Sequence, residues 1–306
     1  MSLNPFQADP AVARRLADHP ADRIGALARA VPPLIHDGIL TAADAAGLVK
    51  RFDLAGTSDL MLLLLTHART YARPPISRFQ VGAIGLEDPT GDLIFGHNVE
   101  FPGTHLGTTL HGEGFVATRA FGRGTRITVL ALGEAHPCAH CRQFLSEFAG
   151  SAALVLIDPL GHRLTLSQLY PWPFDPAYLG ETGAVAGKVQ WPNLTPEHAD
   201  MDSALLDAGR RAHAPYSQCP AAVQLTMTDG FTALGAVIES VAFNPTMGPL
   251  QAALVDFLAR GYDYQDIRSA SLAQVNGGNV NYAPSTAELL KQIAPHVTLT
   301  VQRWAV

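Results

Sequence analysis

The sequence predicts an α/β fold in which a mixed sheet is built twice along the chain. From about residue 79 onward, short apolar segments typical of strands alternate with longer segments typical of helices. The first two predicted strands flank a tight turn, so an antiparallel hairpin begins the sheet and makes it mixed. A set of short motifs then recurs about 140 residues later. We therefore expect an α/β sandwich followed by a second copy of itself.

The first 55 residues are expected to form a small helical segment. Helices are predicted over residues 11–16, 24–30 and 42–49, separated by Pro and Gly. One longer apolar helix follows over residues 56–72. Its leucine-rich run, residues 60–65, is too short to span a bilayer and is expected to be buried in the core.

The next segment, residues 56–177, is expected to be a complete α/β domain. Two hairpin strands, residues 79–86 and 93–98, are predicted around the turn 88–91. A helix from about residue 108, a strand at 126–132, a second helix from residue 138 and a last strand at 153–157 follow. Thr108 or Thr109 is expected to cap the first of these helices. Residues 170–195 are rich in Pro, Gly and Trp and are expected to connect this domain to the next.

Residues 195–306 are expected to be a degenerate copy of that domain. Pro75-Ile76-Ser77 recurs as Pro215-Tyr216-Ser217, and Gly96 through Phe101 has a counterpart near Gly235 and Glu239. Polar residues that stand out in the first copy do not recur. In place of His111 and Glu113 we expect Pro249 and Gln251, and in place of Pro-Cys-x-x-Cys we expect residues 284–288, Pro-Ser-Thr-Ala-Glu.

Composition limits the possible classes of partner. A chain of 306 residues can bury one or two substantial cores. Its net charge of -6 gives no general attraction to polyanions, so we expect a small neutral substrate and no nucleic-acid or membrane partner. Three cysteines without a secretory pattern indicate a reducing, cytoplasmic compartment in which thiols stay available to metal.

The chemistry is expected at His111-Gly112-Glu113 together with Pro137-Cys138-Ala139-His140-Cys141. One imidazole and two thiols can hold a tetrahedral zinc ion and leave the fourth position open to water. Cys138 and Cys141 are three residues apart, so they share one face of a helix whose N-terminus favours thiolates. Glu113 is not needed as a ligand and is free to accept and donate protons. We expect one zinc ion per chain.

Other interpretations of Cys-x-x-Cys fit less well. A redox pair would not account for His111-Gly112-Glu113. A structural zinc site would need a fourth Cys or His, and nothing near the remaining cysteine, Cys219, pairs with it. His140 is expected to point to another face of the helix. The combined pattern H-x-E…P-C-x-x-C is the signature of zinc-dependent nucleobase deaminases.

The chain resembles the long-form homodimeric cytidine deaminases of bacteria over nearly its whole length. The segments that carry the resemblance are residues 79–83, 96–101, 110–113, 137–144, 215–217, 242–246 and 261–264. The resemblance implies a three-layer α/β/α sandwich in two copies and a homodimer. It also implies zinc-dependent hydrolytic deamination of cytidine and deoxycytidine in pyrimidine salvage, in which zinc hydroxide attacks C4 and Glu113 shuttles protons.

The resemblance also implies which residues bind the nucleoside. Asn98 and Glu100, with Val99 between them, would hold the ribose 3′-hydroxyl, and Phe79 would pack near the pyrimidine. Gly112 stands where alanine is commoner in the family, and its backbone N–H would still serve the site. The resemblance further points to Phe174 as a residue that reaches a neighbouring subunit's site.

Without the resemblance, several of these residues have simpler interpretations. Asn98 and Glu100 share one face of a strand end and would be interpreted as solvated polar residues. Phe79 alone would be assigned to the core.

Two other functions remain open from the sequence. A deaminase of another nucleoside, base or polynucleotide would share the zinc chemistry, but a polynucleotide enzyme would need basic or aromatic strand-binding surfaces, which the acidic balance disfavours. A non-catalytic zinc-binding protein is the second alternative, which the presence of Glu113 disfavours.

Overall fold

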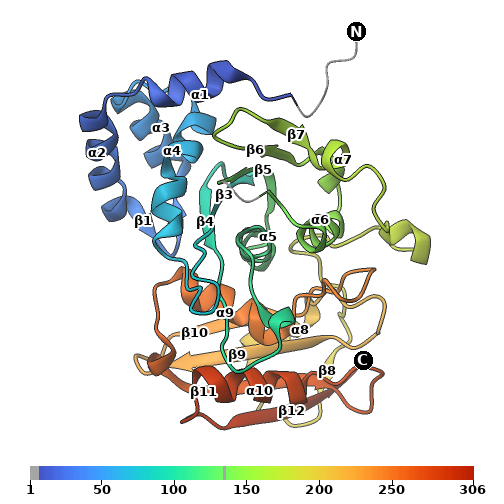
Figure 1. The fold of residues 1–306 in the computed structure, drawn as a ribbon. Coiled ribbons are helices and arrows are strands. Elements are labelled where there is room, and N and C mark those ends of the chain that lie inside the picture. Colours follow the sequence, from blue (N-terminus) through green and yellow to red (C-terminus); the bar gives the residue numbers. More distant parts are fainter. Residues whose placement is uncertain (1–6, 134–135) are drawn as a thin grey trace.

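The computed structural model describes residues 7–133 and 136–306. Residues 1–6 of the predicted N-terminal segment lie outside this range. The described chain forms two mixed sheets with helices on their faces, one sheet in each half of the sequence (Figure 1). The predicted α/β fold with a mixed sheet in two copies is confirmed. In this part of the chain, no helix combines the length and apolar character needed to cross a membrane.

The first sheet has seven strands in the order β1-β2-β4-β3-β5-β6-β7. Their bounds are Ile35–His36 (β1), Ile39–Leu40 (β2), Gly82–Asp88 (β3), Leu93–His97 (β4), Arg126–Leu132 (β5), Val155–Ile157 (β6) and Arg163–Thr165 (β7). β5 and β6 are parallel, and every other neighbouring pair is antiparallel. The sheet is therefore mixed, as a hairpin followed by a helical crossover requires.

Helices cover both faces of this sheet. They are α1 (Pro10–Ala17), α2 (Ala21–Ala30), α3 (Ala42–Arg51), α4 (Thr57–Arg69), α5 (Gly112–Gly122), α6 (Ala139–Ser146) and the short α7 (Leu166–Leu169). Alternate strand residues point to opposite faces, and they enter two separate cores. Ile84 and Phe95 pack with α4 and the N-terminal helices, whereas Ala83 and Ile94 pack with α5. The result is the helix–sheet–helix layering visible in Figure 1.

The N-terminal segment, expected to be helical throughout, also contains a short hairpin. β1 and β2 join the sheet through pairs between β2 and β4, Ile39 with Ile94 and Leu40 with Leu93. Strands of two residues are too short to show an alternating pattern. The turn itself carries a signal, because Asp37 and Gly38 have positive φ angles of 54° and 73°, as in a type I′ turn.

The second sheet repeats the topology of the first in the order β10-β9-β11-β12-β8. Its strands are β8 (Thr195–Pro196), β9 (Ala221–Met227), β10 (Thr232–Ala236), β11 (Ile267–Val275) and β12 (Leu299–Ala305), and its helices are α8 (Ser203–Arg210), α9 (Pro249–Ala259) and α10 (Ala283–Ile293). β9 through β12 take the places of β3 through β6. β8 pairs antiparallel with β12, as β7 does with β6, but it comes from the connection before α8.

The structure corrects the predicted correspondence between the two copies. Leu110 pairs with Val99 just before α5, and Met247 pairs with Ile238 just before α9. This places Gly248 and Leu250, and not Pro249 and Gln251, at the positions of His111 and Glu113. The expected correspondence is displaced by one residue because the loop between the two bridged residues is shorter in the second half.

The same comparison of helix starts corrects the cysteine positions. α6 begins one residue after Cys138 and α10 one residue after Tyr282. Tyr282 and Ser285 therefore stand in place of the two cysteines, and the pairing with residues 285 and 288 is wrong. Among the described residues, both groups with the geometry of metal ligands lie in the first half.

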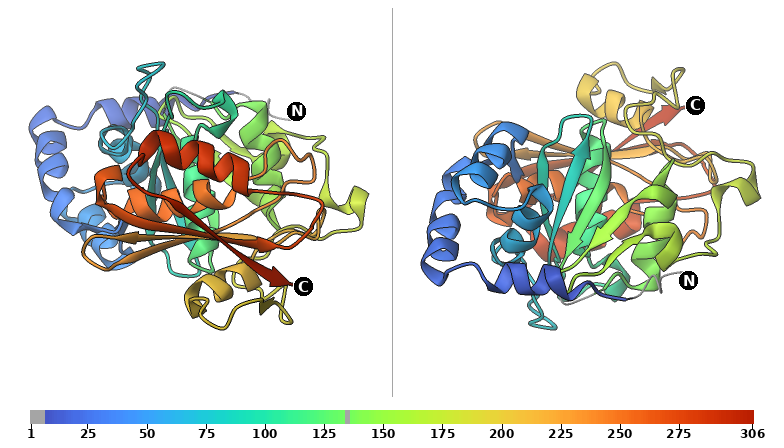
Figure 2. Two further views of the ribbon diagram at one scale, coloured as in Figure 1. Left: turned by 90° about the horizontal axis from the view of Figure 1, so that it is seen from below. Right: turned by 90° about the horizontal axis from the view of Figure 1, so that it is seen from above.

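The two halves pack against each other through α5 and α9, which lie between the two sheets (Figures 1 and 2). Each helix crosses its own sheet at a glycine. A Cβ on Gly96 of β4 would lie 2.5 Å from Val116 Cγ2 and 2.8 Å from Gly112 O. A Cβ on Gly235 of β10 would lie 1.9 Å from the backbone nitrogen of Ala253. Both helices thus approach their sheets more closely than a side chain permits.

Replacing Gly235 with alanine is expected to lower the free energy of unfolding by at least about 3 kcal/mol, the upper end of the usual cost of overpacking, because the backbone of α9 must move. Gly47→Ala is the matched control. Gly47 lies within α3 with open space around its Cβ, so alanine there should stabilise by roughly 0.5–1 kcal/mol. Denaturant titration of both variants measures the difference. Equal effects would contradict the close-approach argument.

Candidate metal centre and nucleoside pocket

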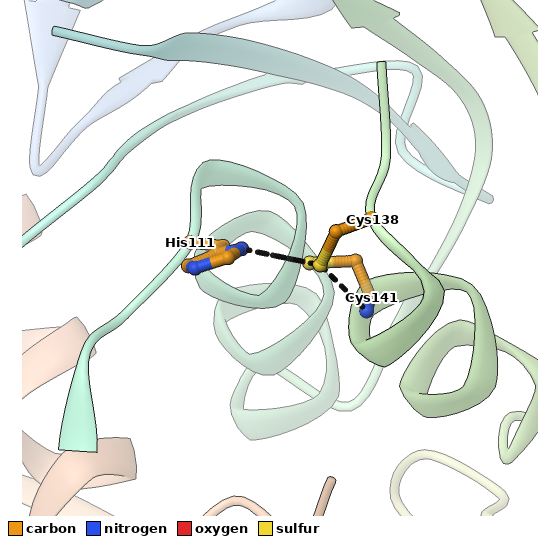
Figure 3. Close-up of side chains that lie close together, drawn as sticks. All are labelled: His111, Cys138 and Cys141. Carbon is orange, nitrogen blue, oxygen red and sulfur yellow. Dashed lines mark hydrogen bonds between the residues drawn. The ribbon is translucent and has the colours of Figure 1, made fainter. Parts of the chain in front are cut away.

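His111, Cys138 and Cys141 come together where the N-termini of α5 and α6 meet (Figure 3). His111 is the residue that precedes α5, and Cys138 is the residue that precedes α6. His111 Nδ1 lies 3.2 Å from Cys141 Sγ and 3.6 Å from Cys138 Sγ, and the two sulfurs are 3.6 Å apart. Three side chains from two distant segments therefore converge on one point.

These spacings suit a zinc ion. With Zn–S bonds of about 2.3 Å and Zn–N bonds of about 2.0–2.1 Å, the ligand atoms of a tetrahedral site lie about 3.5–3.8 Å apart. The observed separations of 3.2–3.6 Å need little adjustment. Three protein ligands leave one position for water or substrate, as in catalytic zinc sites.

The predicted cap of α5 is wrong. Thr108 ends a 3-10 turn, Leu106–Thr108, and its hydroxyl lies 2.7 Å from Thr104 Oγ1 and 2.7 Å from the His105 carbonyl oxygen. The helix begins at Gly112 instead. The entry angle of α5 is set by backbone hydrogen bonds between Leu110 and Val99, which tie the incoming chain to the sheet.

The two thiols are 3.6 Å apart and shift each other's pKa in opposite directions. The hydrogen bond from Cys141 lowers the pKa of Cys138 to about 4, against the opposing effect of burial. The same hydrogen bond, together with burial, raises the pKa of Cys141. The lowered pKa of Cys138 favours its thiolate form, as does its place just before the N-terminus of α6. Metal binding to both sulfurs requires that both thiols lose their protons.

Glu113 lies in the first turn of α5 and is buried, with 5% of its surface exposed. Burial raises the pKa of this carboxyl, and its carboxyl group is within hydrogen-bonding reach of the Cys141 thiol. Glu113 thus lies beside the ligand cluster. A carboxyl with a raised pKa is suited to accept and return a proton near neutral pH.

His140 lies apart from the ligand group. Its ring centroid is 6.3 Å from that of His111, its side chain is exposed, and it does not belong to the group of converging ligand atoms.

Asn98 and Glu100 hold the loop that precedes β3. The Asn98 amide accepts from Val81 N (2.9 Å) and donates to Phe79 O (2.8 Å). The Glu100 carboxylate accepts from the backbone N–H groups of residues 76 and 77, at 2.8 Å each, and from the Ser77 hydroxyl at 2.5 Å. Although burial opposes it, these hydrogen bonds hold the pKa of Glu100 below its usual value. One amide N–H and one carboxylate lone pair remain for a ligand.

The other predicted substrate residues differ in exposure. Val99 is fully buried and contributes its backbone to the bridge with Leu110. Gly112 is buried as the first residue of α5, and a Cβ there would lie 3.1 Å from Ala83 Cβ. Phe79 is 51% exposed and lies before β3, outside the strand that was predicted to include it. Its exposure contradicts the assignment to the core that the residue alone suggested.

The second half of the chain lines a cavity next to two of the metal ligands, a cavity that Glu113, Asn98, Glu100 and Phe79 do not line. A cavity of about 130 Å³ lies beside the ligands His111 and Cys141. It is lined from the second half by Pro245, Thr246, Met247 and Gln251. Gln251 Nε2 donates to Thr108 O at 2.9 Å, which joins α9 to the loop before α5. No local motif signals this contribution, because it depends on how the two halves pack.

Phe174 lies on the surface beyond α6. Its backbone N–H donates to Gln143 Oε1 (3.1 Å) and its carbonyl accepts from Gln143 Nε2 (2.7 Å). Phe174 is 41% exposed, and its ring stacks on Tyr178. Gln143 therefore holds the segment that carries Phe174 against α6, the helix that contains Cys141.

Comparisons with known proteins agree with this geometry. A family model for the cytidine and deoxycytidylate deaminase zinc-binding region matches residues 56–157, and a second model of the same description matches residues 166–287. The cytidine deaminase of Vibrio atlanticus is 33% identical over 265 residues, 86% of this chain and 89% of its own. The cytidine deaminase of Photobacterium profundum is 34% identical over 279 residues, 90% and 94% of the two chains.

A crystal structure of cytidine deaminase from Mycobacterium tuberculosis covers 38% of this chain and 96% of its own, with 32% identity and a TM-score of 0.34. The sequence matches, which span most of both chains, define a zinc-dependent deaminase. This chain belongs to the cytidine deaminase family, and its cofactor is zinc.

Proposed function

We propose that this protein is a hydrolase that deaminates cytidine and deoxycytidine to uridine and deoxyuridine, a reaction of pyrimidine salvage. The observation that carries the proposal is the convergence of His111, Cys138 and Cys141 beside the buried Glu113. The full-length relatives named above are cytidine deaminases and support the same substrate class.

His111, Cys138 and Cys141 hold the zinc ion. Bound zinc supplies the Lewis acidity that lets a water molecule lose a proton near neutral pH. Glu113 accepts that proton and delivers it to N3 of the pyrimidine, which makes C4 more electrophilic. The water oxygen bonds to C4, and Glu113 carries the remaining proton of that water to the amine. The C4–N bond then breaks, so that water and cytidine become uridine and ammonia. Its burial supports this role, because the raised pKa lets one carboxyl both take and give up protons.

Asn98 and Glu100 bind the sugar, with Val99 fixing their spacing at the end of β4. The free amide N–H and carboxylate lone pair described above suit a ribose hydroxyl, which both donates and accepts. Phe79, half exposed beside them, supplies a ring face for the pyrimidine, and the Gly112 backbone lies next to the metal ligands.

A polynucleotide substrate is disfavoured by the net charge of -6. The buried Glu113 argues against a purely structural zinc site. We also infer a cytoplasmic location from the three unpaired thiols.

We further propose a homodimer, in which Phe174 contacts the site of the partner chain. Large apolar side chains gather on the surface beyond α6, at Trp172, Phe174, Tyr178 and Leu179, with exposed fractions of 41–83%. Such a patch on a single chain is typical of an interface.

The roles at the metal are separated by two substitutions. Glu113→Gln keeps size and polarity but removes the proton acceptor, so activity should fall by at least about 10²–10⁴-fold while zinc is retained. Cys138→Ala should lose zinc and activity together, because two protein ligands make a poor site. Ammonia release from cytidine and metal analysis measure both, with one zinc per chain expected in the parent. A metal-free Glu113→Gln variant, or one within a few-fold of the parent rate, would contradict the assignment.

The repeat provides a matched control for Glu100. In the second half, Glu239 accepts from the backbone N–H groups of Tyr216 and Ser217 and from the Ser217 hydroxyl, as Glu100 does in the first. Glu100→Gln and Glu239→Gln should therefore each destabilise the fold, by about 1–3 kcal/mol. Only Glu100→Gln should also raise KM for cytidine, by about tenfold or more for one hydrogen bond to a charged group. Similar KM values in the two variants would remove Glu100 from the binding site.

Complementation between inactive variants tests the dimer. Glu113→Gln and Phe174→Ala should each be impaired alone. After dissociation and mixing in equal amounts, about half of the dimers contain one chain of each variant. In each of these heterodimers one of the two sites has both native residues, so activity should return to about a quarter of the parent value. Light scattering during size-exclusion chromatography should give twice the chain mass of 32.6 kDa. A fully active monomer at micromolar concentration, or a mixture no better than its parts, would overturn the proposal.

A further inference from the structure

A second group of metal-binding side chains lies outside the zinc site. His162 Nδ1 lies 2.7 Å and His136 Nε2 lies 3.1 Å from the same oxygen, Asp158 Oδ2. The three candidate ligand atoms all lie within 4.8 Å of one another. Within the described ranges this is one of two such groups, and the other is the His111–Cys138–Cys141 group.

The sheet topology brings these residues together. β5 and β6 are parallel neighbours, so their carboxyl ends meet at one edge of the sheet. Asp158 directly follows β6, and His136 lies four residues after the end of β5. His162 directly precedes β7, which returns beside β6. Asp158 and His162 are thus placed by two neighbouring strands, and His136 lies in the loop after the third.

Asp158 is a buried carboxylate, 5% exposed, and no ion pair with Lys or Arg is found for it in the described part of the chain. Its Oδ1 accepts from the backbone N–H groups of Leu160 and His162, at 3.0 Å each. These bonds hold the carboxylate in place and leave Oδ2 directed at the two imidazoles. Oδ2 accepts hydrogen bonds from both imidazoles, but no Lys or Arg among the described residues balances its charge, and a buried charge without a paired cation is costly to the fold. A bound cation would offset that cost.

We propose that His136, Asp158 and His162 form a second divalent-metal site, weaker than the zinc site. Two imidazole nitrogens and one carboxylate oxygen suit borderline ions such as Zn²⁺, Co²⁺ and Ni²⁺, whereas Mg²⁺ and Ca²⁺ prefer oxygen ligands alone. The site has no thiolate, and the His136 side chain is 52% exposed. It therefore holds metal less tightly than the thiolate site. The expected number of tightly bound zinc ions stays at one per chain, at the thiolate site.

The second site is joined to the first through the backbone. His136 lies two residues before the zinc ligand Cys138, and Pro137 stands between them. The Pro137 carbonyl accepts from Arg142 Nε at 2.8 Å, which fixes this residue to α6. A metal held by His136 would restrain the chain on the other side of Pro137. Occupancy of the second site thus restrains the segment that carries a zinc ligand.

The test is a titration of the zinc-loaded protein with Co²⁺, followed by absorption spectroscopy and equilibrium dialysis. We expect one additional equivalent per chain with ligand-field bands of cobalt but no thiolate-to-cobalt charge-transfer band. The missing band separates the new site from exchange at the two cysteines. His136→Ala and His162→Ala should each weaken this binding by about tenfold or more, since changes even outside the ligand shell have effects of that size. His198→Ala, at an exposed histidine elsewhere on the chain, should bind as the parent does.

The half-exposed His136 can be replaced without disturbing the core, so its variant remains informative if His162→Ala is unstable. Three results would overturn the proposal: no additional equivalent in the parent protein, unchanged binding in both variants, or an additional equivalent that carries the thiolate band. None of these measurements depends on deaminase activity, so failure here leaves the proposed function standing.

Discussion

The close approach of α5 to its sheet determines where the chemistry of this protein can take place. Gly96 leaves room for the backbone of Gly112 and the side chain of Val116, and a Cβ at this position would collide with both. Gly112 is the first residue of α5, so the contact fixes the end of the helix that carries His111 and Glu113. From that position α5 can meet the N-terminus of α6, and the three ligand side chains converge. Glu113 is buried by the same packing, and burial raises its pKa.

The two halves of the chain show which features belong to the fold and which to the chemistry. Both halves keep the glycine under the central helix, at Gly96 and Gly235, and both keep a carboxylate that binds the loop before the first strand, at Glu100 and Glu239. Because the second half retains that carboxylate without the zinc ligands, its structural role does not require a substrate. A role for Glu100 in binding the sugar is therefore additional to its role in the fold, and the repeat is what allows the two to be separated.

The fold was predictable where the sequence pattern is local. Short apolar segments on either side of a turn predict the hairpin of β3 and β4. The spacing of His111, Cys138 and Cys141 indicates a metal site because the ligands lie at helix starts. The short β1–β2 hairpin escaped the pattern analysis, although its Asp-Gly turn was a usable signal. The correspondence of the two copies was misplaced because loops of unequal length separate equivalent elements. The contribution of Met247 and Gln251 to the cavity beside the metal ligands lies beyond local patterns, since it depends on how α9 packs against α5.

A division of roles between the halves follows from the physical cost of the site. The first half buries Glu113, a carboxyl with no ion pair among the described residues, and burial of such a group destabilises a fold. At the corresponding position the second half has Leu250, which is 2% exposed and carries no such cost. α9 packs that apolar surface against α5 and closes one side of the cavity beside the metal ligands. Leu250 in place of Glu113 therefore removes a destabilising feature from the second half, which continues to form a wall of that cavity. Stability and catalysis place opposite demands on the first turn of this helix, and a duplicated fold can meet each demand in a different copy.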